Sequence, residues 1–306
     1  MTAPAPPFRL GTRASPLALA QAHLVRDALC AAHGWKASAV QIIPMTATGD
    51  RILDRSLADI GGKALWTKEL DRALLEGEID CAVHSMKDVE TIRPDTINLV
   101  AMLPRGDPRD RLIGAKNIET LPHAAKVGTN SPRRSAQLLA LRPDLQITLF
   151  RGNVATRLAK LAAGEADATL LAAAGLDRLG MTDTGFAVPI EVMLPAAAQG
   201  AIGIECRQRD DATQALLAPI SHTDTMRCVL TERALLAGLS AGCHSPVAAH
   251  AVLAGSNIHL RAELLLPDGS ERVAGTAIIA EPSDARDLAA DLLGRASPEL
   301  RALFEQ

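Results

Sequence analysis

One short pattern occurs twice in this chain and constrains its fold more than any other feature. Residues 74–80 (LLEGEID) align with residues 161–167 (LAAGEAD), and an apolar run follows each copy. Each copy is typical of a helix that ends at a glycine and is followed by a strand. A second pair of similar segments, 11–15 (GTRAS) and 128–131 (GTNS), lies between a short apolar run and a predicted helix. The repetition predicts two similar α/β lobes, which usually enclose a ligand-binding cleft.

Segments rich in proline and glycine divide the rest of the chain. These breaks lie at 102–108, 194–200 and 219–223. The pattern after the last break predicts, in order, a helix at 226–239, strands at 247–253, 258–266 and 272–280, and a closing helix at 283–293. Residues 267–270 (PDGS) predict a hairpin turn between the last two strands. We therefore expect an α/β protein of three domains, the third a small α+β domain with a three-stranded sheet.

The composition excludes several classes of protein. Of the 306 residues, 48% are hydrophobic and 22% are charged, and the formal net charge is −3, as in soluble globular proteins. Only 2% are aromatic, so the chain lacks the side chains on which nucleic-acid bases stack. No apolar run is long enough to span a membrane and no secretory signal is recognisable, so we expect no nucleic-acid or membrane partner and a cytoplasmic location. The five cysteines contain no CxxC spacing, which indicates neither a disulfide framework nor a metal site.

The segment 82–89 (AVHSMKDV) is the first candidate for chemistry. Its apolar start predicts a buried strand that runs directly into polar side chains, and α/β proteins bind ligands at such strand ends. Asp88 could act as a general acid or base or stabilise a cation, and Lys87 and Ser85 could hold an anionic substrate. The alternative is a solvated turn with a capping aspartate.

Arginines recur beside Gly, Ser and Thr. Arg13 follows Gly-Thr, Arg133 and Arg134 follow GTNSP, and Arg151 and Arg157 enclose GNVAT. Guanidinium groups bind carboxylates or phosphates in pairs of hydrogen bonds, and a helix start adds backbone N–H donors. The pattern favours an anion site, although a single surface arginine is often only solvated.

Two further segments each allow a functional and a structural interpretation. Residues 60–66 (IGGKALW) could form a lid or an ordinary glycine-rich connection. Cys243, in the small-residue segment 241–246 (AGCHSP), is the best candidate for a nucleophile or a covalent attachment point, although a lone cysteine is more often structural. His244 beside it does not make a catalytic pair, because adjacent residues of an extended segment point apart.

Together these segments resemble the porphobilinogen deaminase (hydroxymethylbilane synthase) family. The resemblance extends along the whole chain, with the motifs in the expected order. The segments that carry it are 11–18, 61–63 with 67–69, 84–89, 107–110, 128–129 with 133–134, 151–154 with 156–157, 199–200 with 203–206, and 242–243.

The resemblance implies a transferase of tetrapyrrole (haem) biosynthesis. Such an enzyme joins four porphobilinogen molecules head to tail, releases one ammonia at each addition and yields hydroxymethylbilane. It implies a dipyrromethane cofactor, bound through a thioether to Cys243, as the primer. It also makes Asp88 the catalytic carboxylate, which would stabilise the cationic species left when ammonia departs.

The resemblance further assigns contacts to the acetate and propionate groups of the pyrroles. The implied cofactor contacts are Ser15, Lys87, Thr129, Ser131, Arg133, Arg134, Arg151, Gly152 and Asn153. The implied substrate contacts are Arg13, Gln21, Arg157, Arg178 and Gln199. Gly61, Gly62 and Lys63 would belong to the family's flexible loop, and no metal is implied.

The family architecture has two lobes like those of type II periplasmic binding proteins and a third, cofactor-attachment domain. On this chain it implies a discontinuous first lobe (1–101 plus 200–219), a second lobe (102–199) and an α+β domain (220–306). The family expectation is a monomer whose partners are porphobilinogen and its oligomers.

The chain departs from the family pattern at several positions. Glu90 replaces the usual proline, Trp66 a phenylalanine, Pro132 a leucine and Ala241 a glycine. These departures bear on loop motion and on packing around the cysteine. Two alternatives stay open: a two-lobed protein that only binds a small dicarboxylate, and an inactive homologue. The charge of Asp88 opposes the first, and the presence of both Asp88 and Cys243 opposes the second.

Overall fold

The structure is a computed structural model that describes residues 6–46, 67–242 and 244–305. The chain forms two compact units. Of the described residues, unit 1 contains 6–46, 67–106 and 201–226, and unit 2 contains 107–200, 227–242 and 244–305. No helix in the described part of the chain is both long enough and apolar enough to cross a membrane.

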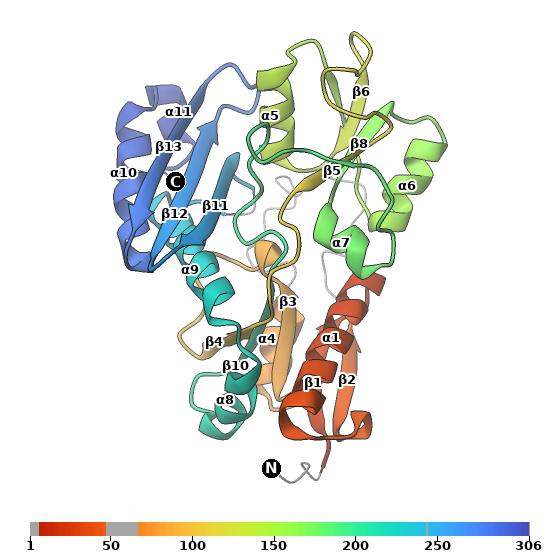
Figure 1. The fold of residues 1–306 in the computed structure, drawn as a ribbon, viewed down its shortest axis with the longest axis vertical. Helices are drawn as coiled ribbons and strands as arrows, with labels where there is room; N and C mark the ends of the chain where they lie inside the picture. Colours follow the sequence, from red (N-terminus) through yellow and green to blue (C-terminus); the bar gives the residue numbers. More distant parts are fainter. Residues whose placement is uncertain (1–5, 47–66, 243, 306) are drawn as a thin grey trace. The chain divides into compact units, whose positions relative to one another are not determined.

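Unit 1 consists of one five-stranded sheet and its helices, which we call lobe 1. Its strands are β1 (Phe8–Arg13), β2 (Val40–Met45), β3 (Cys81–Ser85), β4 (Ile97–Met102) and β10 (Ile202–Arg207). Its helices are α1 (Pro16–His33), η1 (Ala37–Ala39), α4 (Lys68–Leu75), η2 (Met86–Asp88), α8 (Asp211–Leu217) and η3 (Ala218–Ile220). The strand order is β2-β1-β3-β10-β4, in which β1 is parallel to β2 and β3, whereas β10 is antiparallel to β3 and β4 (Figure 1).

Helices cover both faces of this sheet. Successive side chains of a strand point to opposite faces, and β3 follows this rule. Val83 joins the apolar core that α1 covers, whereas its neighbour Ala82 joins the core that α4 covers. α1 begins where the sequence predicts, because Ser15 accepts a hydrogen bond from the Ala18 amide and Pro16 occupies the first helical position.

Unit 2 contains a second five-stranded sheet with its helices, which we call lobe 2. Its strands are β5 (Asp110–Ile113), β6 (Lys126–Thr129), β7 (Gln146–Leu149), β8 (Ala168–Ala172) and β9 (Phe186–Ala187). Its helices are α5 (Pro132–Leu141), α6 (Val154–Ala162) and α7 (Ala173–Arg178) (Figure 1). The strand order is β7-β6-β8-β5-β9, with β6 parallel to β7 and β8 and with β5 antiparallel to β8 and β9.

The two lobes share one topology, so the predicted repeat is confirmed. In each sheet three parallel strands are followed by one antiparallel strand, β10 or β5, and then by an edge strand, β4 or β9, that is antiparallel to it. The likeness extends to single hydrogen bonds. The Arg9 amide donates to Asp80 Oδ2 at 2.7 Å, and the Lys126 amide donates to Asp167 Oδ2 at 2.7 Å. Both aspartates are the last residue of the repeated sequence pattern.

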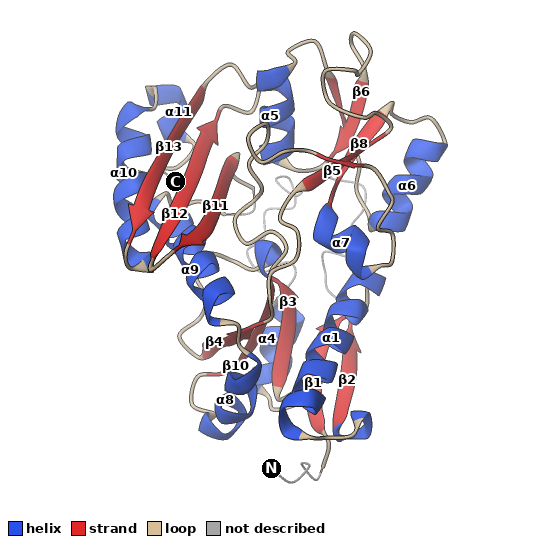
Figure 2. Cartoon of the chain, in the orientation of Figure 1, coloured by secondary structure: helices blue, strands red, loops and turns tan. Residues whose placement is uncertain are grey.

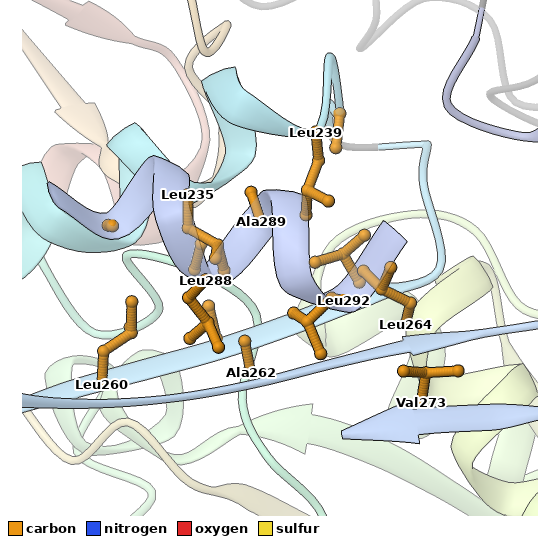
Figure 3. Close-up of a cluster of buried hydrophobic side chains, with 14 of the residues drawn as sticks. Leu235, Leu239, Leu260, Ala262, Leu264, Val273, Leu288, Ala289 and Leu292 are labelled. Carbon is orange, nitrogen blue, oxygen red and sulfur yellow. The ribbon is translucent and has the colours of Figure 1, made fainter. Parts of the chain in front are cut away.

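The rest of unit 2 is an α+β domain, which we call the C-terminal domain. Its strands, β11 (Val247–Ala254), β12 (Asn257–Leu265) and β13 (Arg272–Ile279), form an antiparallel sheet in that order (Figure 2). Its helices are α9 (Thr223–Gly238), whose residues up to Met226 belong to unit 1, η4 (Pro282–Asp284), α10 (Ala285–Arg295) and α11 (Pro298–Ala302). Leu288 and Leu292 of α10 pack with Ala262 and Leu264 of β12 (Figure 3). The predicted strands, hairpin and closing helix of this domain are confirmed.

Candidate active site

A small cavity in lobe 1 brings several predicted site residues together. It has a volume of about 60 Å³ and lies where the parallel strands β1 and β3 end, which is the sheet edge where α/β proteins bind ligands. Its polar lining residues are Arg13, Ser15, Gln21, Thr67, His84, Ser85 and Asp88. Five of the predicted candidate residues, Arg13, Ser15, Gln21, Ser85 and Asp88, therefore share one cavity.

A short helical turn places Asp88 in this cavity. The turn, η2, begins directly after β3, and the Met86 amide donates to the carbonyl of Ala201 at 3.1 Å. Asp88 is half-buried, and no other side chain among the described residues neutralises its carboxylate. Such a carboxylate can stabilise a cation or accept a ligand N–H. The predicted cofactor contact Lys87 lies in the same turn.

Gln21 and Ser85 form a pair in the cavity wall. Gln21 extends from α1, is 2% exposed, and donates from Nε2 to Ser85 Oγ at 2.8 Å. A buried amide needs such a partner, since an unpaired polar group costs about 1–3 kcal/mol. The pair joins α1 to the end of β3 and thereby fixes the wall beside Asp88.

A buried ionic network lies behind the cavity. Glu205 of β10 has no exposed side-chain surface, and its Oε2 lies 3.2 Å from His84 Nε2 and 2.8 Å from Arg93 Nη2. Burial alone would raise the pKa of Glu205, but the contact with the His84 ring and the charge and hydrogen bonds of Arg93 outweigh burial and lower this pKa to about 2. Glu205 is therefore a fixed anion at neutral pH.

Lobe 2 presents two helix N-termini beside basic residues. Ser131 caps α5 by accepting from the Arg134 amide, and Asn153 caps α6 by accepting from the Thr156 amide at 2.9 Å. Thr129 ends β6, and its Oγ1 accepts from the Ser131 amide at 3.2 Å. The remaining predicted residues of these two segments are Arg133, Arg134, Arg151 and Gly152. The positive end of each helix dipole and the arginine charges suit this part of lobe 2 for anions.

Arg133 and Arg134 are buried and share one carboxylate. Arg133 Nη2 lies 2.9 Å from Asp110 Oδ2, and Arg134 Nη2 lies 2.7 Å from Asp110 Oδ1. Their Nε–H groups, by contrast, have no hydrogen-bond partner among the described atoms, although both are buried. Burial lowers the pKa of Arg133, and Asp110 offsets part of this effect. Each guanidinium thus keeps one donor for a further acceptor.

Three more predicted contacts lie in unit 2. Gln199 donates from Nε2 to Asp110 Oδ1 at 2.8 Å, so it joins the arginine cluster. Arg157 donates to the carbonyl of Gly152 at 3.0 Å, beside the N-terminus of α6. Arg178 donates to the carbonyl of Gly200 at 2.6 Å, and burial lowers its pKa to about 10.

Some predicted site residues lie outside the described part of the chain. They are Cys243, Gly61, Gly62 and Lys63. Near position 243, the Ser245 amide donates to the carbonyl of Gly242 at 3.1 Å.

Thr67, Glu205 and Arg93 were not among the predicted site residues. Thr67 lines the cavity, and the other two form the network behind it. One signal was available for Glu205, because a charged residue inside the apolar run 202–206 (IGIEC) needs a buried partner. Nothing in the sequence near Arg93 identifies it as that partner.

Comparisons with known proteins identify the family. A family model described as "Porphobilinogen deaminase, dipyromethane cofactor binding domain" matches residues 8–215, and one described as "Porphobilinogen deaminase, C-terminal domain" matches residues 226–295. The chain is 59% identical over 310 residues to a porphobilinogen deaminase of Sphingopyxis alaskensis, with 99% of this chain and 98% of that protein covered. The chain belongs to the porphobilinogen deaminase family. A porphobilinogen deaminase of Paracoccus denitrificans is 51% identical over 302 residues, with 97% and 96% covered.

Solved structures show a weaker likeness. The periplasmic VFT2 domain of BvgS from Bordetella pertussis is 16% identical, with a TM-score of 0.41, and the match covers 70% of this chain and 86% of that domain. This likeness is too weak to bear on the fold, which rests on the sheets described above.

The arginine cluster of lobe 2 fits the cofactor that the family model names. Dipyrromethane consists of two porphobilinogen units, so it carries four carboxylates. The unpartnered buried Nε–H groups of Arg133 and Arg134 are donors of the kind that a carboxylate accepts. The helix N-termini at Ser131 and Asn153 add backbone donors beside them.

Proposed function

We propose that this porphobilinogen deaminase joins porphobilinogen molecules at Asp88, on a dipyrromethane primer held by Cys243 through a thioether. The cavity in lobe 1 carries the assignment of Asp88. Its carboxylate has no neutralising partner among the described residues, and it shares the cavity with Arg13, Ser15 and Gln21. An uncompensated carboxylate beside an arginine suits a substrate that has carboxylate side chains and develops positive charge at its reacting carbon.

The residues of lobe 1 have two roles, which are binding the substrate and stabilising the charge that develops during the reaction. Arg13 binds a carboxylate of porphobilinogen, and Ser15 and Gln21 donate hydrogen bonds that orient it. Asp88 stabilises the positive charge that develops when the substrate loses ammonia, and it accepts hydrogen bonds from pyrrole N–H groups. When bound, the dipyrromethane supplies the pyrrole carbon to which the first substrate molecule is joined.

The residues of lobe 2 hold the carboxylates of the cofactor and the growing chain. Arg133, Arg134 and Arg151 are buried, and a buried guanidinium binds a carboxylate more strongly than an exposed one. The proposed cofactor contacts there also include Thr129, Ser131, Gly152 and Asn153, and the proposed substrate contacts include Arg157, Arg178 and Gln199. A monomeric state, a cytoplasmic location and the three-domain division stay predictions.

The intact mass of the denatured protein tests the primer. We expect extra mass equal to two linked pyrrole units, mapped to the Cys243 peptide. Cys243→Ser should lack it, while Cys30→Ser, a change of the same type at a half-buried cysteine of α1, should keep it. If the mass is bare and added porphobilinogen leaves Cys243 unmodified, the binding-protein alternative is favoured.

Replacing Asp88 tests the catalytic role. We expect Asp88→Ala to lower product formation about 100- to 1,000-fold, because an electrostatic group at the reacting centre typically contributes that much. The fold and the cofactor mass should stay unchanged. Asp95→Ala, at an exposed position of the same unit, is the matched control and should keep wild-type turnover. Near-normal product formation by Asp88→Ala would refute the role.

A further inference from the structure

Arg93 joins three separate segments of lobe 1. Its guanidinium lies 2.5 Å from Asp71 of α4, 2.8 Å from Glu205 of β10 and 2.8 Å from Glu90, which follows η2. The Arg93 side chain is only 11% exposed. Its hydrogen bonds to Asp71 and Glu205 and their charges raise the pKa of Arg93 despite its burial, so it is a permanent cation.

Glu90 connects this cluster to the wall of the Asp88 cavity. Thr67 Oγ1 donates to the Glu90 carboxylate at 2.9 Å, and Thr67 is fully buried. Thr67 and Asp88 line the same cavity, as does Val89, which lies between Asp88 and Glu90. The Glu90 side chain thus contacts both Arg93 and Thr67, which lies in the cavity wall.

The two ends of the Asp88 turn are held by different means. At the first end, the Met86 amide donates to Ala201, and the Met86 side chain fills the space over Gly203, where an added Cβ would lie 2.1 Å from its sulfur. At the second end, the Glu90 carboxylate contacts Thr67, which precedes α4, and Arg93, which in turn contacts Glu205 of β10.

We propose that Glu90 and Arg93 are positioning residues for Asp88. Arg93 fixes the Glu90 carboxylate between α4 and β10, and Glu90 holds the second end of η2, so that the Asp88 carboxylate keeps its direction into the cavity. A displacement of about 1 Å at a reacting group can cost about 100-fold in rate, which makes such support functionally important. The inference rests on the proposed role of Asp88.

Two substitutions of one residue separate positioning from simple stability. Glu90→Ala removes both anchors, and we expect kcat to fall about 10- to 100-fold with the KM for porphobilinogen within about twofold, since the carboxylate-binding arginines are untouched. Glu90→Gln keeps an oxygen that accepts from Thr67 and Arg93, and it should recover most of kcat. Glu76→Ala is the matched control, because Glu76 pairs with Arg72 on the exposed face of α4 and should leave kcat unchanged.

The measurements are steady-state kinetics well below the melting temperature of each variant, far-UV circular dichroism, and the intact mass that reports the cofactor. A wild-type kcat for Glu90→Ala would overturn the inference. An equal loss in Glu90→Ala and Glu90→Gln, in step with their melting temperatures, would also overturn it, because that result indicates a structural role alone. If Asp88→Ala is inactive while Glu90→Ala is normal, only this inference fails. If Asp88→Ala is active, the proposed role of Asp88 fails first.

Discussion

Glu205 illustrates how one buried charge is stabilised by its neighbours. A lone carboxylate in the interior costs several kcal/mol, and the protein offsets this cost with the guanidinium of Arg93 and a contact to the His84 ring. Arg93 contacts two more carboxylates, Asp71 and Glu90, so it is shared by three anions. Removing one member of such a group is costly, because the others are left unpaired.

This arrangement predicts a specific acid sensitivity. The pKa of Glu205 is lowered to about 2 in the folded protein, whereas the pKa of a glutamate in the unfolded chain is about 4.3. The ionised carboxylate therefore stabilises the fold above about pH 4.3, and this contribution is lost as the pH falls from about 4.3 towards about 2. Thermal midpoints of the wild type and Glu205→Gln should differ most at neutral pH and converge across that window. A constant difference between pH 7 and pH 2 would contradict this assignment.

How much of the site could be predicted from the sequence depends on how far apart its residues lie along the chain. Asp88, Gln21 and Ser15 belong to local motifs, so their sharing of one cavity is a consequence of motif and strand order. Glu205 and Arg93 are 112 positions apart, and their pairing exists only once β10 has joined the sheet. No local pattern encodes such a pair. The shared use of Asp110 by Arg133 and Arg134 was missed for the same reason.

At the scale of elements, most of the fold could be predicted because its signals are local. Ser15 with Pro16, and Ser131 with Pro132, each combine a capping side chain with a proline at the first helical position, and both helices begin there. The substitution of Pro132 for the usual leucine is thus compatible with the helix. The placement of β10 beside β3 was not predictable from periodicity, since strand order depends on contacts between distant segments.

The close approach of β6 to Phe150 gives an element-level prediction. A Cβ added at Gly128 would lie 2.4 Å from the Phe150 ring, and Phe150 is 1% exposed. We expect Gly128→Ala to lower the free energy of unfolding by about 1–3 kcal/mol through overpacking. The control is Gly294→Ala in α10, where an added Cβ has open space. This substitution should raise the free energy of unfolding by about 0.4–1 kcal/mol. Chemical denaturation measures both, and a loss no greater than that of the control would contradict the packing argument.

At the scale of the whole molecule, lobe 2 and the C-terminal domain form one compact unit. Gln137 of α5 donates to Glu263 of β12, and Glu263 also lies 2.5 Å from Arg272 of β13. The hairpin between β12 and β13 packs on α5 as well, since an added Cβ at Gly269 would lie 2.3 Å from the Ala140 amide nitrogen. The C-terminal domain is thereby joined to the helix that carries Arg133 and Arg134.

Two glycines of the C-terminal domain test this junction. Gly269 has a φ of +74° and packs against α5, whereas Gly255 has a φ of +64° and no neighbour within 4 Å. Gly255→Ala should cost only the left-handed strain of about 1–2 kcal/mol. Gly269→Ala should cost clearly more and should increase hydrogen exchange of the α5 amides. Equal costs, with exchange in α5 unchanged, would show that the hairpin does not support the helix.

β10 comes late in the sequence but pairs with strands from the first part of the chain, and this order affects how the protein folds during synthesis. The sheet of lobe 2 is built from one continuous stretch, Asp110 to Ala187, so all its strands are available as soon as that stretch has emerged. The sheet of lobe 1 stays open until residues 202–207 arrive to pair with β3 and β4. Contacts between distant segments slow folding, and domains generally fold as units during synthesis. Glu205 is therefore among the last residues to reach lobe 1, and Arg93 gains its most deeply buried anion only when the rest of both sheets has been made.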